Sequence, residues 1–168
     1  LALALARAER QAGNATAALD AYERYVDLTD GPSADALLEY AALLEEREFY
    51  ADAIEVLAGA ADAAGALPGQ QALAQFERGR LLLTEAQEVE GGLDAVRTAI
   101  TLGFDDAEAY ADLLANPDLV GGGELEELGG DAGLLEIGDV DEAVPENAIA
   151  PDPADGEESG AAPPDDGG

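Results

Sequence analysis

Apolar side chains recur every three or four residues through most of the first 115 residues, and polar side chains fill the positions between them. This spacing places the apolar residues on one face of an α-helix. The helical stretches are separated by short segments that contain Gly, Pro, Asp or Asn. The pattern therefore predicts an all-α fold of amphipathic helices whose apolar faces pack on one another.

The helical stretches come in pairs that repeat at an interval of about 35 residues. In the first helix of a pair the recurring residues are Leu5-Ala6, Tyr40-Ala41 and, two intervals later, Tyr110-Ala111. In the second helix they are Ala18 with Tyr22, Ala53 with Leu57, and Gly92 with Val96. A fixed interval of this length indicates a repeat protein in which each two-helix unit covers the apolar face of its neighbour.

Small residues occupy the positions where the two helices of a unit would cross. We expect Ala6, Ala41 and Gly79 of the first helices to face Ala18, Ala53 and Gly92 of the second helices, so that the backbones approach closely. The register of the third unit is open by one residue, because either Phe76 or Gln75 can start its pattern. Gly79 fits the second register, which makes the turn near residues 84–91 one residue longer than usual.

These residues resemble the tetratricopeptide repeat family, whose unit of 34 residues is a helix, a turn and a second helix. The second unit matches the family pattern best, although the family's Trp and terminal Pro are missing and Glu9 replaces an apolar residue in the first unit. The resemblance covers about residues 1–115. The positions that would carry repeat packing are Leu5, Ala6, Ala18, Tyr22, Leu37, Tyr40, Ala41, Leu44, Tyr50, Ala53, Leu57, Gly79, Gly92, Val96, Tyr110, Ala111 and Leu114.

The resemblance implies a right-handed solenoid of antiparallel helix pairs, about three and a half units long. The units span about 1–31, 33–66 and 70–102, with a partial unit at 105–116. Turns are expected at Asp30 to Ser33, at Pro68-Gly69 and at Gly103, and Ser33 is expected to cap a helix. The apolar start of the chain reads as the middle of a truncated helix, so a targeting signal upstream would not be visible and no compartment is predicted.

The composition changes after Pro117 to Gly, Pro, Asp and Glu. We expect residues 117–128 to form a linker around Gly121 to Gly123 and a short terminal helix. Residues 129–168 hold twelve acids, no base and no aromatic residue, and Pro recurs through them. Such a segment cannot bury enough apolar surface to fold alone, so an acidic disordered tail is predicted.

The charge balance limits the classes of partner. The chain has 38 acidic residues against seven Arg and no Lys, for a formal charge of -31. It should therefore repel nucleic acid and anionic lipid, whose binding depends on Lys and Arg. Residues 1–128 alone hold 26 acids and the seven Arg, a charge of -19, which fits either adaptation to high salt or a coding bias.

Few catalytic mechanisms are compatible with a chain that has no His, Cys or Lys. The adjacent acids Glu45-Glu46 and Glu126-Glu127 would point to different sides of a helix. The acids near Asp139 and Asp155 lack calcium-loop spacing, so only weak, non-specific cation binding is expected, with no cofactor and no specific metal. No apolar run reaches the roughly 18 residues that a membrane-spanning helix needs.

The resemblance implies that a partner would bind the concave surface formed by the first helices. The residues expected there are Leu3, Arg7, Arg10, Leu38, Ala42, Glu45 and either Arg78 or Arg80. The Arg side chains would either contact an acidic segment of a partner or pair locally with nearby Glu and Asp.

The function predicted is a protein-protein interaction scaffold or adaptor that is not an enzyme, with a protein partner that the sequence does not identify. Two alternatives remain. The chain could be a structural spacer or assembly module of a larger envelope or secretion protein, with no peptide ligand of its own. More remotely, it could be an enzyme that uses carboxylates.

Overall fold

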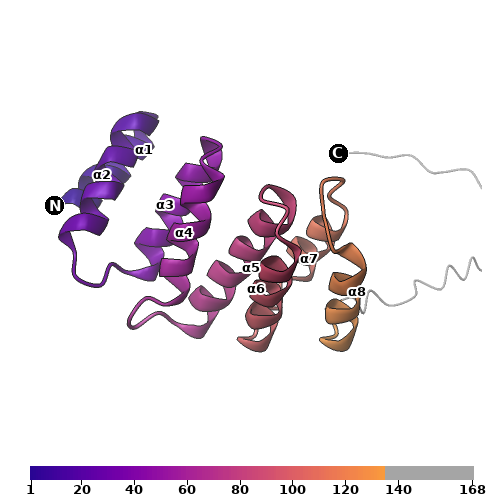
Figure 1. Cartoon of the computed structure of the whole chain (residues 1–168). Coiled ribbons are helices and arrows are strands. Elements are labelled where there is room, and N and C mark those ends of the chain that lie inside the picture. The colour runs from indigo at the N-terminus through magenta and orange to yellow at the C-terminus, as the bar shows by residue number, and fades with distance from the viewer. Residues whose placement is uncertain (135–168) are drawn as a thin grey trace, which may run out of the picture. The chain divides into compact units, whose positions relative to one another are not determined.

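The computed structural model describes residues 1–134, and this part of the chain consists of helices joined by loops, with no strand (Figure 1). The all-α class predicted from the sequence is confirmed for these residues. The helices are α1 (Ala2–Gln11), α2 (Ala15–Leu28), α3 (Ala34–Glu46), α4 (Tyr50–Ala61), α5 (Pro68–Thr84), α6 (Val89–Thr101), α7 (Ala107–Leu114) and α8 (Gly122–Asp131).

From α1 to α6, each helix lies next to the helix that follows it in the chain (Figure 1). The main packing contacts are made by α1 with α2, α3 with α4, and α5 with α6, and α4 also packs on α5. The loops inside the first two pairs span residues 12–14 and 47–49, three residues each, whereas the loop of the third pair spans residues 85–88, four residues. The extra residue expected in the third pair is therefore present.

Local side-chain chemistry sets several helix starts. The Ser33 hydroxyl accepts a hydrogen bond from the backbone N–H of Ala36 at 3.4 Å, as predicted for a helix cap. Asp106 caps α7 in the same way, by accepting from the N–H of Ala109 at 2.9 Å. Pro68 begins α5 instead of lying in a turn, because the first helical position needs no N–H donor and suits the fixed φ of proline.

The closest helix crossing is made by two glycines of the third pair. A Cβ atom on Gly79 would lie 2.7 Å from Cγ2 of Val96 and 2.9 Å from the carbonyl oxygen of Gly92, closer than van der Waals contact allows. A Cβ atom on Gly92 would collide with Leu83. Glycine at both positions therefore lets α5 and α6 approach, which is the role the sequence suggested for small residues at this crossing.

The first two pairs use alanine where the third pair uses glycine. Ala6 and Ala18 are fully buried together in one apolar cluster with Tyr22 and Leu43. Ala41 and Ala53 are buried together in the next cluster, which reaches across to Leu81 of α5. The predicted facing positions of the first and second helices thus lie in shared clusters in both pairs.

The largest apolar cluster lies among α5, α6, α7 and α8. It includes Phe76, Val96, Tyr110 and Leu125, each with at most 1% of its surface exposed. The ring of Phe76 stacks on that of Phe104 with 4.0 Å between ring centroids. The hydroxyl of Tyr110 donates a hydrogen bond to the carbonyl oxygen of Leu125, which satisfies a buried polar group.

The end of the folded part differs from the sequence prediction. Helix α8 continues to Asp131 and begins at Gly122, so Gly122 and Gly123 belong to its first turn and not to a linker. After the helix, Gly133 has φ of 72°, and the N–H groups of Gly133 and Leu134 donate to the carbonyls of Gly130 and Gly129. This C-terminal cap turns Leu134 back into the core, so the folded part extends to residue 134 and the predicted tail does not begin at residue 129. The rest of the predicted tail, 135–168, lies outside the described residues.

Most residues predicted to carry repeat packing are buried, but not all. Leu5 keeps 47% of its surface exposed, because Ala6 and not Leu5 faces α2. Tyr40, Tyr50, Ala111 and Leu114 are partly buried. The buried members are Ala6, Ala18, Tyr22, Leu37, Ala41, Leu44, Ala53, Leu57, Gly79, Gly92, Val96 and Tyr110.

Candidate functional site

Arginine and glutamate side chains link the first helices of consecutive pairs. Nε of Arg7 on α1 lies 2.8 Å from Oε2 of Glu39 on α3, and its Nη2 lies 2.9 Å from Oε1 of the same carboxylate. Arg10 donates to Oε1 of Glu46 at 2.8 Å and to the carbonyl oxygen of Glu39 at 3.0 Å. The bidentate geometry of the Arg7 pair gives this junction a defined orientation as well as charge attraction.

Glu39 receives a third side-chain hydrogen bond, from a buried tyrosine. The hydroxyl of Tyr22 on α2 donates to Oε2 of Glu39 at 2.9 Å, and its ring stacks on Tyr40 with 5.5 Å between centroids. The pKa of Glu39 is lowered, chiefly by its hydrogen bond to Arg7 and despite partial burial. The pKa of Tyr22 is raised, first by burial and then by the neighbouring Glu39. One carboxylate thus joins α1, α2 and α3.

A second arginine bridge joins α3 to α5. Nη2 of Arg80 lies 2.7 Å from Oε2 of Glu45, and Nε of Arg80 lies 2.8 Å from Oε2 of Glu77. Burial alone would lower the pKa of Arg80, but the carboxylates of Glu77 and Glu45 outweigh it and the pKa is raised. Arg80 is therefore held as a cation between two acids.

A hollow of about 320 Å³ lies beside the Arg80 bridge. Its apolar part includes Leu73, which keeps 41% of its surface exposed. Its polar part is formed by the bridged side chains themselves. The lining residues are Leu38, Ala41, Ala42, Glu45, Leu57, Leu73, Glu77 and Arg80.

The structure divides the predicted binding residues among three places. Leu38, Ala42, Glu45 and Arg80 share the hollow between α3 and α5. Arg7 and Arg10 lie at the junction of α1 and α3, where Leu3 packs against the neighbouring apolar cluster. These Arg side chains pair with Glu of this chain, which agrees with the local-pairing interpretation.

Arg78 does not lie with the other predicted binding residues. It lines a different hollow with Tyr50, Ile54 and Glu85, and its buried Nε has no hydrogen-bond partner among the described residues. Arg78 and Arg80 are two positions apart on α5, and side chains at that spacing point to different sides of a helix. The alternative in which Arg78 lies on the binding face is therefore wrong.

Sequence reasoning missed Glu39, Glu46, Glu77 and Leu73 as members of this face. Arg7 and Glu39 are 32 residues apart, which does not match the repeat interval, but two other bridges carried a signal in the sequence. Arg10 and Glu46 are 36 residues apart, and Glu45 and Arg80 are 35 apart. These separations match the repeat interval, and equivalent positions of neighbouring repeats lie side by side. An Arg at one position and a Glu one interval away is thus a signal for a bridge between units.

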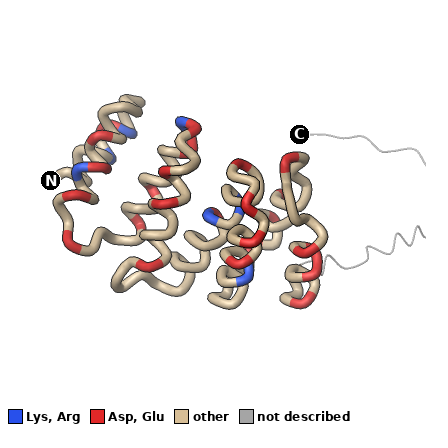
Figure 2. Tube along the Cα trace, in the orientation of Figure 1, with Lys and Arg blue, Asp and Glu red and all other residues tan. Residues whose placement is uncertain are grey.

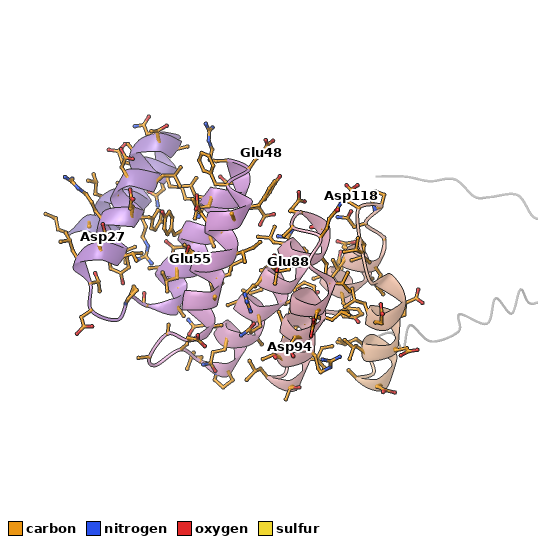
Figure 3. The ribbon with its side chains drawn as sticks, in the orientation of Figure 1. Asp27, Glu48, Glu55, Glu88, Asp94 and Asp118 are labelled. Atoms are coloured by element: carbon orange, nitrogen blue, oxygen red, sulfur yellow. The ribbon has the colours of Figure 1, made fainter. Side chains whose placement is uncertain are left out.

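A larger hollow, of about 710 Å³, opens on the other helices of the first two pairs. Its walls come from α2 and α4, and residues of α3 and of the segments after α2 and α4 close it. The acids Asp27 and Glu55, labelled in Figure 3, line it from α2 and α4. The sequence analysis assigned no role to this region.

Comparison with known proteins found no relative of this chain: no protein-family model matches it, and no curated protein resembles it significantly. Over residues 1–134, no helix has the length and apolar character needed to cross a membrane. Within the same residues, no group of three or more acidic side chains is placed to hold a metal ion.

Proposed function

We propose that this protein is an interaction scaffold of the tetratricopeptide type, a right-handed solenoid that binds a segment of another protein on the face formed by its first helices. Support comes from the sequential pairing of the helices and from the small residues buried at each crossing. These are the features that let two-helix units stack as a continuous array.

The observation that carries the proposal is the apolar hollow between α3 and α5. Leu38 and Leu73 offer apolar surface there, and the ion pairs of Arg80 hold the polar rim in place. An apolar hollow with a few oriented polar groups is the usual form of a binding site, and a segment with one apolar anchor residue would fit its volume.

The ion pairs also define the chemistry of that segment. Arg7, Arg10 and Arg80 already face the carboxylates of Glu39, Glu46, Glu45 and Glu77, so the face has no surplus of positive charge. A strongly acidic segment would have to displace these carboxylates. The partner segment is therefore better described as apolar and hydrogen-bonding than as acidic.

The enzyme alternative finds little support at this face. A general acid that works near neutral pH needs a raised carboxyl pKa, and the pKa of Glu39 is shifted in the opposite direction. The spacer alternative has one specific observation in its favour, because the Arg–Glu bridges stiffen the junctions between pairs whether or not a ligand binds.

The proposal is tested by affinity capture with the full chain from cells that produce it. Leu73→Glu places a charge in the hollow, and Leu28→Glu is the matched control, since Leu28 is 79% exposed on α2 and lies outside both hollows. A specific partner should be retained by the wild type and by the control but reduced about tenfold by Leu73→Glu. If every retained protein is insensitive to Leu73→Glu, the first-helix site is refuted and the spacer function is favoured.

A further inference from the structure

The hollow between α2 and α4 has an apolar floor. Val26, Leu37, Tyr40 and Val56 line it, and all four side chains are partly or fully buried. Its volume of about 710 Å³ is within the range of about 300–1,000 Å³ that ligand sites occupy. This space is open on the side of the second helices and is separate from the face proposed above to bind a partner.

Two rows of carboxylates border this floor. Glu23 and Asp27 stand four residues apart on α2, and Asp52 and Glu55 stand three residues apart on α4, so each pair follows one side of its helix. Asp62 extends the second row, and all five acids are exposed. Figure 2 shows in red how Asp and Glu are distributed along the helices.

The two rows give the lining of the hollow an excess of negative charge. All seven Arg lie within the described residues, and none of them lines the hollow or forms an ion pair with its five acids. The pKa of Tyr40 on the floor is raised, first by burial and then by the charges of Glu23, Asp52 and Asp27. The carboxylates of both walls therefore act on the same floor, in contrast to those of the first-helix face, which are neutralised by Arg.

Gly59 keeps the floor open at a position where packing does not require glycine. A Cβ atom there would meet only Cδ1 of Leu37, at an ordinary contact distance of 3.9 Å. Glycine inside a helix costs about 1 kcal/mol relative to alanine, and at Gly79 and Gly92 the close crossing explains it. At Gly59 the remaining physical effect of the missing side chain is a wider hollow.

The charge of the hollow decides which occupant fits. Residues 135–168 of this chain hold eleven acids and no base, so they are repelled by the two acidic rows. A helix that lies between α2 and α4 would place one apolar side on the floor and its two flanks against carboxylates. We propose that this groove binds a basic amphipathic helix of a partner protein, with Lys or Arg on both flanks of an apolar stripe.

The test uses the full chain and a labelled synthetic peptide as long as α2, 14 residues, with Leu on one face and Lys on both flanks. Fluorescence anisotropy measures its dissociation constant, and a scrambled peptide of the same composition controls for charge alone. The amphipathic peptide should bind at least about tenfold more tightly than the scrambled one, because only its apolar stripe can reach the floor. Equal binding of the two peptides would overturn the proposal.

Matched variants of the protein locate the binding. Asp27→Asn with Glu55→Gln should weaken the amphipathic peptide about fivefold, whereas Asp112→Asn with Glu126→Gln, which removes the same charge from α7 and α8, should change it less than about twofold. Gly59→Phe should fill the hollow and weaken binding about tenfold or more, and Gly130→Phe on α8, where a Cβ meets nothing within 4 Å, is its control.

The variants also distinguish binding in this groove from binding on the face of the first helices. Leu73→Glu should leave the peptide affinity unchanged, so that either site can fail without the other. Equal weakening by both charge pairs would show that long-range attraction to an acidic protein accounts for binding, and it would overturn the groove. Retained affinity in Gly59→Phe with an unchanged circular dichroism spectrum would overturn it as well.

Discussion

The helices at the two ends of the described structure are held together by different kinds of side-chain contact. At the N-terminal end, Arg7, Arg10 and Tyr22 converge on Glu39 and its neighbours, and the buried clusters are small and rich in alanine. At the C-terminal end, α5 to α8 surround one large apolar cluster with stacked Phe76 and Phe104. The first junction combines a small apolar cluster with ion pairs, and the second is formed mainly by a large buried apolar area.

This difference predicts different responses to mutation and to pH. Apolar burial contributes roughly 25 cal/mol per Å² whatever the protonation state of nearby groups. Half-exposed ion pairs contribute about 1 kcal/mol or less, and they weaken with salt and with acid. The helix pairs contact mainly their neighbours, so the two ends should be separable in experiment.

The largest effect is expected in the C-terminal cluster. Phe76→Ala removes a fully buried ring between Phe104 and Tyr110 and should lower the free energy of unfolding by about 3–5 kcal/mol. Chemical denaturation followed by circular dichroism measures it. Phe49→Ala is the control, because Phe49 is 48% exposed, and it should cost less than about 1 kcal/mol. Equal costs for the two variants would contradict the contrast.

Two Gly→Ala substitutions should differ in sign. Gly79→Ala forces a Cβ against Val96 and the Gly92 carbonyl and should destabilise the protein by about 1–3 kcal/mol. Gly59→Ala meets no obstacle in α4 and should stabilise it by about 0.4–1 kcal/mol. Thermal melts of both variants test this, and a neutral Gly79→Ala would mean that α5 and α6 do not cross as closely as described.

A smaller and pH-dependent effect is expected at the N-terminal junction. The folded-state pKa of Glu39 is lowered, so its contribution is fully present above its ordinary pKa of 4.5 and is lost as the pH falls through the lower folded value. Glu39→Gln should cost about 1 kcal/mol at pH 7, a value that allows for screening by solvent. The difference between wild type and variant should vanish in acid.

The control for that measurement is Glu23→Gln, an exposed glutamate with no ion pair among the described residues. Its unfolding free energy should stay within about 0.5 kcal/mol of wild type at pH 7. A cost for Glu39→Gln that persists unchanged below its folded pKa would show that shape and not charge holds α1 on α3.

The smallest effect is expected from removal of the acidic C-terminal segment. A chain that ends after Leu134 should unfold within about 0.5 kcal/mol of the full chain, because residues 135–168 offer few apolar groups to bury. A chain that ends after Leu128 also loses the buried Leu134 and the cap at Gly133, and it should lose about 2 kcal/mol or more. Similar midpoints for the two truncations would contradict this boundary.

Some of the fold could be predicted because its signal is local. The helix periodicity, the Ser33 cap and the small residues at Gly79 and Gly92 can each be read from a few neighbouring positions, and the structure contains all of them. The end of α8 was missed although Gly133-Leu134 is a recognisable helix stop. The surrounding Gly and Asp suggested a linker, and the burial of Leu125 by α5 to α7 outweighed that composition.

The candidate sites were less predictable than the helices. The family resemblance placed Arg80 on one face with Leu38, Ala42 and Glu45, and the structure brings these four residues together. The sequence could not choose between Arg78 and Arg80, and Arg78 lines another hollow. No sequence motif predicted the groove between α2 and α4. Its five acids lie on α2, on α4 and at the C-terminal end of α4. In the sequence, each of them taken alone looks like an ordinary solvent-exposed helix residue.

The sequence by itself determined that residues 1–115 are largely helical, that these helices come in pairs and which small residues lie at their crossings. Each of these features follows from side-chain size and spacing along one helix. Only the tertiary structure decided which Glu side chains Arg7, Arg10 and Arg80 bind and that Leu134 is buried. It also showed that the carboxylates of α2 and α4 border one apolar floor. The physical reason is that these features depend on the distances and angles between helices, which side-chain packing sets across the whole array.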